Sequence, residues 1–263
     1  MKKTLLIAVA ALAAGITSIQ AQAVYSQNIV GYYNITIPAG KFVLAASQLN
    51  LDNTNSINNI FSGLASDANG STNTAIWLWN PGTQQYSSYK YYLGPDADNY
   101  FLNSGSANGF YDAGGTLVTQ NLGVGQAAFL QNLAPSSITV TVTGGVPTGT
   151  NLITLGENFT LVASPVPVGQ DITSTNIGFA GTSDSNGATN DVCWTWNSGT
   201  QQYAAYKYFI GADADNYFLN SGSVNGFYDS GGTLISVAPP VGNGFFIQHS
   251  GPAETWTNIF KVN

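Results

Sequence analysis

An internal duplication at a spacing of 117 residues constrains this chain more than any other feature. Trp77–Asn80, with the sequence WLWN, recurs as Trp194–Asn197, with the sequence WTWN. Residues 74–132 align to residues 191–249 without a gap, at roughly three identities in five positions, while identity upstream of the tryptophans is roughly a quarter. A repeat of this length is too long for a solenoid and is the size of a small domain. The alignment therefore predicts two homologous units in tandem.

The predicted units span residues 24–147 and 148–263, and the glycine-rich segment 144–149 contains the boundary. Residues 1–23 are assigned to a leader. Because the linking segment is short, a strand from one unit could complete the sheet of the other. The repeat is compatible with units that exchange a strand and with units that do not.

The hydrophobic pattern of each unit is typical of short strands. In the first unit we expect strands at Val30–Ile37, Phe42–Ala46, Ile76–Trp79, Gln85–Tyr92, Thr116–Gln120, Ala127–Gln131 and Ile138–Thr143. Asn80–Thr83 is a strong hairpin turn, and Ser56–Ala65 predicts one short helix. The predicted fold class is all-β, with two tandem homologous β-sandwich or small-barrel units and short helical turns at most.

Composition excludes two classes of partner. Charged residues make up 7% of the chain, and all six basic residues are lysine. An ordinary soluble domain has about 25% charged residues. The net charge of −7 leaves no basic surface to displace counterions from phosphates, which argues against nucleic acid and against anionic membranes. Neutral ligands or cations are the expected partners.

Residues 1–23 have the pattern of a signal peptide. Lys2 and Lys3 form a positively charged start, Leu5–Leu12 is apolar, and Ala21–Ala23 supplies a small–x–small cleavage site. No later stretch is long and apolar enough for a transmembrane segment. We therefore expect secretion to the extracellular space or the cell surface, with the periplasm as an alternative location.

A family resemblance is carried by Val24–Tyr33, Ile37–Gly40, Leu161–Pro167, Val241–Ile247 and Thr255–Phe260. Together these segments resemble a group of uncharacterised secreted repeat proteins found in bacteria of the verrucomicrobial and lentisphaeral kind. The resemblance covers nearly the whole chain after the leader. Its motifs are strand and turn segments, so it implies export and duplication and assigns no catalytic residue.

The stretch that matches best between the units is a loop rich in Asn and Asp. It carries Asp96, Asp98 and Asp112 in the first unit, and Asp213, Asp215 and Asp229 in the second. Calcium prefers such hard oxygen ligands, so one hypothesis is a calcium site in each unit. The alternative is that these carboxylates form Asx-turns and are otherwise solvated.

Paired tyrosines follow each predicted turn on one face of a strand. They are Tyr89 and Tyr91 in the first unit, and Tyr206 and Tyr208 in the second. Such pairs could stack on sugar rings, or they could pack across strands with their hydroxyls reaching water. Trp77 and Trp79 likewise share a strand face, for which packing is the simpler interpretation.

The side chains available for catalysis are few. His249 is the only histidine, its counterpart is Asn132, and with one cysteine the common zinc sites are excluded. We therefore expect no enzyme. The predicted function is an exported, non-catalytic structural or adhesive component of the cell surface or extracellular matrix that associates with itself or with surface polysaccharide. The alternative is a carbohydrate-binding protein that uses the paired tyrosines and the Asn/Asp-rich loop.

Overall fold

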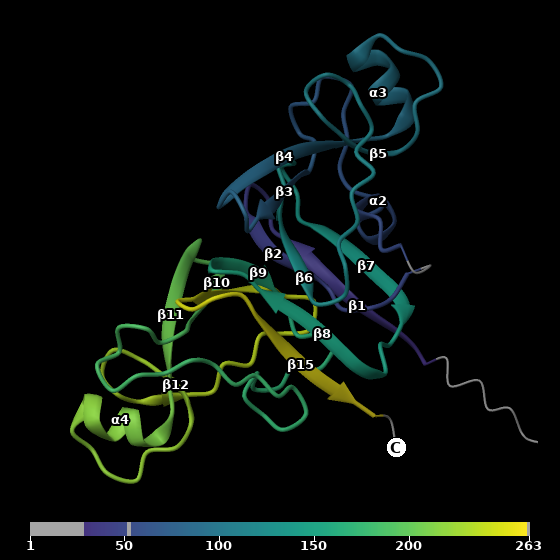
Figure 1. Ribbon diagram of the computed structural model, residues 1–263. Coiled ribbons are helices and arrows are strands. Elements are labelled where there is room, and N and C mark those ends of the chain that lie inside the picture. Colours follow the sequence, from purple (N-terminus) through teal and green to yellow (C-terminus); the bar gives the residue numbers. More distant parts are fainter. Residues whose placement is uncertain (1–28, 52–53, 262–263) are drawn as a thin grey trace, which may run out of the picture.

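The computed structural model describes residues 29–51 and 54–261, and strands form most of its regular structure (Figure 1). Within these residues the helices are short: α2 spans Ile57–Ile60, α3 spans Gly94–Phe101 and α4 spans Gly211–Phe218. The predicted all-β class is confirmed. No helix in the two described ranges is long and apolar enough to cross a membrane. The predicted leader, residues 1–23, lies outside them.

The first half folds into two antiparallel sheets. Its strands are β1 (Val30–Ile37), β2 (Phe42–Ser47), β3 (Ala75–Asn80), β4 (Gln85–Tyr92), β5 (Gly109–Tyr111), β6 (Gln126–Gln131) and β7 (Ile138–Gly145). β1 pairs with β7, and the larger sheet has the order β2-β6-β3-β4-β5. The expected strand at residues 116–120 is wrong, because only an isolated bridge joins Tyr111 to Leu117 there. The helix expected at residues 56–65 is limited to α2.

The second half has the corresponding two sheets. Its strands are β8 (Gly149–Leu155), β9 (Asn158–Val162), β10 (Val192–Asn197), β11 (Gln202–Phe209), β12 (Gly226–Tyr228), β13 (Leu234–Ile235), β14 (Phe245–His249) and β15 (Glu254–Phe260). β8 pairs with β15, and the larger sheet has the order β9-β14-β10-β11-β12-β13. β13 alone among these strands has no strand at the equivalent place in the first half.

Alternating side chains on β1 build the core of the first half. Tyr33, Ile35 and Ile37 are buried, whereas Tyr32 is 75% exposed. The buried residues pack against the larger sheet, for example against Ile76. Because the side-chain period of a strand is two, one face of β1 covers the core and the other meets water. The first half is therefore a small sandwich rather than a barrel, and its larger sheet ends at β5, whose outer edge is bridged by Leu117.

An apolar cluster that is separate from the cores of the two halves joins the halves. It contains Leu44, Ala46, Ala127, Phe129, Leu161, Ala163 and Phe246. Beside it Gln126 pairs with Val162 and Ala45 bridges Asn243, so the larger sheets meet through β6 and β9. All other strand pairs among the described residues stay within one half, and no complete strand is exchanged. α3 and α4 lie at opposite ends of the molecule, with the junction between them (Figure 1).

Candidate functional site

The tryptophans of β3 face the junction between the halves. Ile76 and Leu78 are buried in the core of the first half, so the alternating Trp77 and Trp79 point to the opposite side of the sheet. There both indoles pack against the apolar cluster that joins the halves. Trp194 and Trp196 of β10 pack against the same cluster from the second half.

The hairpin turn sets the strand register and thereby determines which residues lie beside these tryptophans. Asn80 Oδ1 accepts hydrogen bonds from the backbone N–H groups of Gly82 and Thr83, at 2.9 and 3.1 Å. The resulting register places Tyr86 opposite Trp79, with 4.8 Å between their ring centroids. In β10 and β11 the same register places Tyr203 opposite Trp196, also at 4.8 Å.

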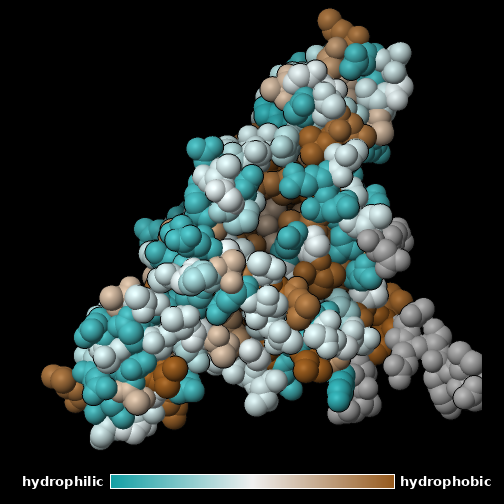
Figure 2. Space-filling view, in the orientation of Figure 1, coloured by the Kyte–Doolittle hydropathy of each residue, from teal (hydrophilic) through white to brown (hydrophobic). Residues whose placement is uncertain are grey.

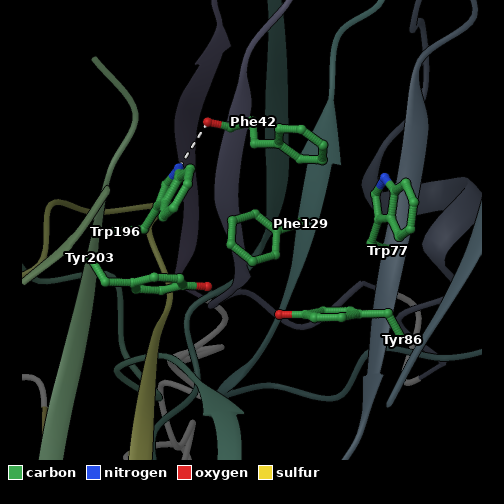
Figure 3. A pocket seen from close by; sticks show the side chains of 6 residues that line it. All are labelled: Phe42, Trp77, Tyr86, Phe129, Trp196 and Tyr203. Atoms are coloured by element: carbon green, nitrogen blue, oxygen red, sulfur yellow. Dashed lines mark hydrogen bonds between the residues drawn. The ribbon is translucent and has the colours of Figure 1, made fainter. Parts of the chain in front are cut away.

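These aromatic side chains converge on a pocket of about 310 Å³ at the junction (Figure 3). Its lining consists of Phe42, Trp77, Tyr86, Phe129, Trp196 and Tyr203. Two of these residues come from the second half, and the Trp196 Nε1–H donates a 3.0 Å hydrogen bond to the Phe42 carbonyl of the first. The pocket is therefore assembled only when the halves are together.

A second pocket of about 290 Å³ repeats this arrangement. Its lining consists of Trp79, Tyr86, Phe159, Trp194, Tyr203 and Phe246. The Trp79 Nε1–H donates to the Phe159 carbonyl at 2.8 Å, as Trp196 does to Phe42. Both pockets share Tyr86 and Tyr203, which form a wall between them.

The two shared tyrosines point their hydroxyls toward each other across the junction (Figure 3). Burial raises the pKa of Tyr203 to about 12. Burial and the facing Tyr203 hydroxyl together raise the pKa of Tyr86. Both hydroxyls are therefore uncharged at neutral pH and can donate and accept hydrogen bonds at the edge of each pocket.

The tyrosines that the sequence pointed to lie elsewhere. Tyr91 and Tyr208 are 2% and 4% exposed, belong to the cores of the two halves, and cannot stack on a ligand. Tyr89 and Tyr206 are partly buried and pack against the same cores. The residues that the sequence analysis missed are Tyr86 and Tyr203. The hairpin register was the available signal, because pairing Asn80 with Gln85 places Tyr86 beside Trp79.

The six candidate calcium ligands are engaged by the chain itself. In the first half Asp96 Oδ2 accepts from the Ser66 hydroxyl at 2.6 Å. Asp98 accepts hydrogen bonds from the backbone N–H groups of Gly105 and Ser106, which close the loop after α3. The Ser106 side chain, and then these N–H groups, lower the pKa of Asp98. Asp112 holds its turn by accepting from Gly114 and Thr116. The equivalent residues Asp213, Asp215 and Asp229 make the equivalent bonds.

These hydrogen bonds are the ones that the alternative of local turns predicts. Asp96 and Asp98 lie on a helix, α3, where a loop is expected from the sequence, whereas Asp112 lies beyond β5. No three of the six carboxylates form a group close enough to share an ion within the described residues. α3 and the hydrogen bonds of its carboxylates order the segment from within the chain.

The mutation pair Asp98→Ala and Asp215→Ala tests this explanation. We expect a lower melting temperature, because four backbone N–H groups lose their carboxylate acceptor, and we expect the same decrease in calcium and in chelator. Thermal unfolding of wild type and variant in both buffers measures it. A calcium-dependent stabilisation of wild type that the variant lacks would restore the calcium hypothesis.

A second pair of loops was missed by the sequence analysis. Asp67 accepts hydrogen bonds from the backbone N–H groups of Asn69, Ser71 and Thr72, and Asp184 does so in the second half from Asn186, Ala188 and Thr189. The Thr72 and Thr189 hydroxyls contribute most to lowering the pKa of these two carboxyls. The pattern Asp-x-Asn-Gly-x-Thr-Asn, present at both places, was the available signal. These acids shape loops and face no pocket described above.

Asp191, His249 and Glu254 form a cluster in the second half alone, in which Asp191 and His249 are buried. Within the described part of the chain it is the one group of three residues with metal-binding atoms close together. His249 Nδ1 lies 2.7 Å from Asp191 Oδ1, and Nε2 lies 2.8 Å from the Pro252 carbonyl. Both ring nitrogens therefore face acceptors, and donating to both requires the protonated imidazolium. A ring with no free lone pair is an ion-pair partner, not a metal ligand.

Electrostatics agree with this protonation state. Burial alone lowers the pKa of His249, but the hydrogen bond and charge of Asp191, with the Pro252 carbonyl, outweigh it and raise the pKa. Burial also raises the pKa of Glu254, whose Oε1 lies 3.7 Å from His249 Nδ1. In the first half Thr74 and Asn132 occupy the places of Asp191 and His249, so the pair is absent there.

Apolar side chains outside the pockets are dispersed. On the face shown in Figure 2 they form separate patches, including patches at the two far ends. Val30 and Tyr32 on β1 are 76% and 75% exposed, and Leu152 on β8 is 64% exposed. Scattered exposed apolar residues are usual on protein surfaces. At the junction, by contrast, the two pockets are lined by aromatic rings alone.

No family model matches this chain, and no curated protein or solved structure is significantly similar to it. The functional interpretation therefore depends on the geometry of the paired pockets.

Proposed function

We propose that this chain is an exported, non-catalytic adhesive protein that holds neutral polysaccharide at the cell surface or in the extracellular matrix. The observation that carries the proposal is the convergence of six aromatic side chains around each pocket. Tyr86 and Tyr203, which both pockets share, are 37% and 41% exposed. Exposed aromatic rings offer flat apolar faces against which the C–H face of a sugar ring can stack, with polar tips that hydrogen-bond.

The small residues beside the tryptophans support access to the ring faces. The cross-strand neighbour of Trp77 is Ser88, and that of Trp194 is Ala205. Both small residues are exposed. Directly opposed side chains on a sheet usually cover one another, and Ser and Ala are too short to cover an indole.

Charge supports a neutral ligand. Each pocket is lined only by Phe, Trp and Tyr, and the pKa values of the two tyrosines at its edge are raised. The whole chain carries a net charge of −7, which repels an acidic polysaccharide at low ionic strength. An uncharged glycan meets no such repulsion.

The environment of His249 supports a non-catalytic role. This side chain is 2% exposed, and both of its ring nitrogens are held by acceptors. It is the only histidine of the chain, so the usual general base is not accessible to a substrate.

Retention on insoluble polysaccharides tests the proposal. The full chain without residues 1–23 is incubated with cellulose, chitin, xylan, mannan or starch, and the pellet is assayed. We expect retention on at least one of these solids, and a roughly tenfold or greater loss of affinity in the double variant Tyr86→Ala, Tyr203→Ala. Two aromatic contacts at about 0.5–1.5 kcal/mol each correspond to a change of that size.

Tyr32→Ala is the matched control, because Tyr32 is a 75% exposed tyrosine on β1 that lines neither pocket. It should bind as the wild type does. Equal retention of the double variant and the control would place binding outside the pockets. If the wild type is retained on no glycan, adhesion through sugar is wrong and assembly with other copies becomes the better explanation.

A further inference from the structure

The two pockets are related by an approximate twofold axis. Phe42, Trp77, Phe129 and Trp196 of the first pocket correspond to Phe159, Trp194, Phe246 and Trp79 of the second, and Tyr86 and Tyr203 exchange places. The backbone hydrogen bonds across the junction also come in pairs in which equivalent residues of the two halves change places. Ala46 N–H donates to the Gly242 carbonyl at 2.9 Å, and Ala163 N–H donates to the Gly125 carbonyl at 2.8 Å. Reciprocal contacts of this kind define a twofold interface.

From this symmetry, and resting on the proposed function, we propose that each molecule binds two separate segments of neutral polysaccharide in opposite directions and cross-links them. A polysaccharide strand has two chemically different ends, so a site that orients its sugars reads the strand in one direction. A twofold rotation about an axis perpendicular to the strand reverses that direction in the second site. One straight strand that crossed both pockets would therefore run in the wrong direction through the second pocket.

The size of the pockets fits two short contacts rather than one long groove. Their volumes, about 310 and 290 Å³, lie at the lower end of the roughly 300–1,000 Å³ usual for small-ligand sites. The shared wall of Tyr86 and Tyr203 stands between them. Each pocket also has walls of its own, which allows one to be altered without the other.

Single-pocket variants test the cross-linking. Trp77 lines only the first pocket and Trp194 only the second. Cellohexaose, or the matching oligosaccharide of whichever polysaccharide retains the wild type, is titrated into each variant by calorimetry. We expect two sites per chain for the wild type, one for Trp77→Ala, one for Trp194→Ala and none for the double variant.

Agglutination gives an independent readout. Particles coated with the retained polysaccharide should be agglutinated by the wild type at low protein concentration. Either single variant should bind the particles without agglutinating them, because one site cannot connect two surfaces. Ser88→Arg and Ala205→Arg provide a second set of variants in case alanine disturbs folding. They change exposed positions beside Trp77 and Trp194 and should block one pocket each.

One site per wild-type chain, lost in either single variant, would show a single continuous site and overturn cross-linking while leaving adhesion intact. Agglutination by a single-pocket variant as strong as by the wild type would also overturn it. Absence of binding by the wild type to every glycan would overturn both proposals.

Discussion

Replacing Asp191 with alanine should lower the free energy of unfolding by about 3–5 kcal/mol, because it leaves a buried imidazolium without its partner. Asp191 and His249 are 0% and 2% exposed, and their contact measures 2.7 Å. Asp191 Oδ2 also accepts from the Thr182 backbone N–H at 2.9 Å, so a second, partly buried donor loses its acceptor. Urea unfolding of the wild type and the variant measures the difference.

The first half supplies the control for this prediction. Asp191→Thr with His249→Asn copies Thr74 and Asn132, which occupy these places in the first half. Removing both charges together avoids an unpaired ion, so this double variant should lose less stability than Asp191→Ala alone. An Asp191→Ala variant as stable as the wild type would show that the ion pair contributes nothing.

The same pair predicts how stability varies with pH. Because the pKa of His249 is raised in the folded state, its contribution is fully present below its unfolded pKa of about 6.5 and is lost as pH rises through the folded value. Asp191 and Glu254 are the charged groups that face it. The chain has one histidine and one cysteine, and the pKa of the buried Cys193 is raised by burial, so few other groups titrate here. Melting temperatures from pH 6 to 9 should fall in the wild type and stay nearly level in Asp191→Thr, His249→Asn. If the melting temperatures of the wild type and the double variant changed equally with pH, a protonated His249 would be contradicted.

Gly244→Ala should destabilise the contact between the halves. A Cβ at this position would overlap the Ala127 Cβ and lie 3.0 Å from the Val162 carbonyl oxygen. Gly244 has no left-handed φ, so the effect is steric rather than conformational. Overpacking costs typically 1–3 kcal/mol, and we expect about 3 kcal/mol, because one of the contacts is backbone and cannot turn away. Thermal unfolding measures the loss, and weaker polysaccharide retention should accompany it.

Symmetry supplies the control here as well. Ala127 and Gly244 are equivalent positions of the two halves, and they meet across the junction with a single methyl group between them. Exchanging them, as Ala127→Gly with Gly244→Ala, keeps one methyl group and should recover most of the lost stability. An exchanged variant as unstable as Gly244→Ala would mean that this contact is not the cause.

Much of the local structure could be predicted from the sequence because its causes are local. Alternation over Val30–Ile37 indicates a strand with one buried face, and Asn80–Thr83 indicates the turn, since both depend on neighbours along the chain. α3 was missed because its segment is rich in Asn and Asp and was therefore expected to be a loop, although Pro95 in the first turn suits a helix. α3 ends at Leu102, whose backbone is left-handed. Leucine rarely adopts this conformation, so the sequence gives no signal for the end of the helix.

The sequence by itself determined most strands of the first half, the turn and the repeat of 117 residues, all of which follow from spacing along the chain. Tertiary structure alone decided the candidate site. Whether Tyr86 or Tyr91 is exposed depends on which face of β4 packs against the core of the first half, and each pocket takes side chains from both halves. The replacement of Thr74 and Asn132 by Asp191 and His249 is visible in the alignment, but only folding brings residues 58 positions apart to within 2.7 Å. Such contacts depend on packing between distant segments, which local preferences do not encode.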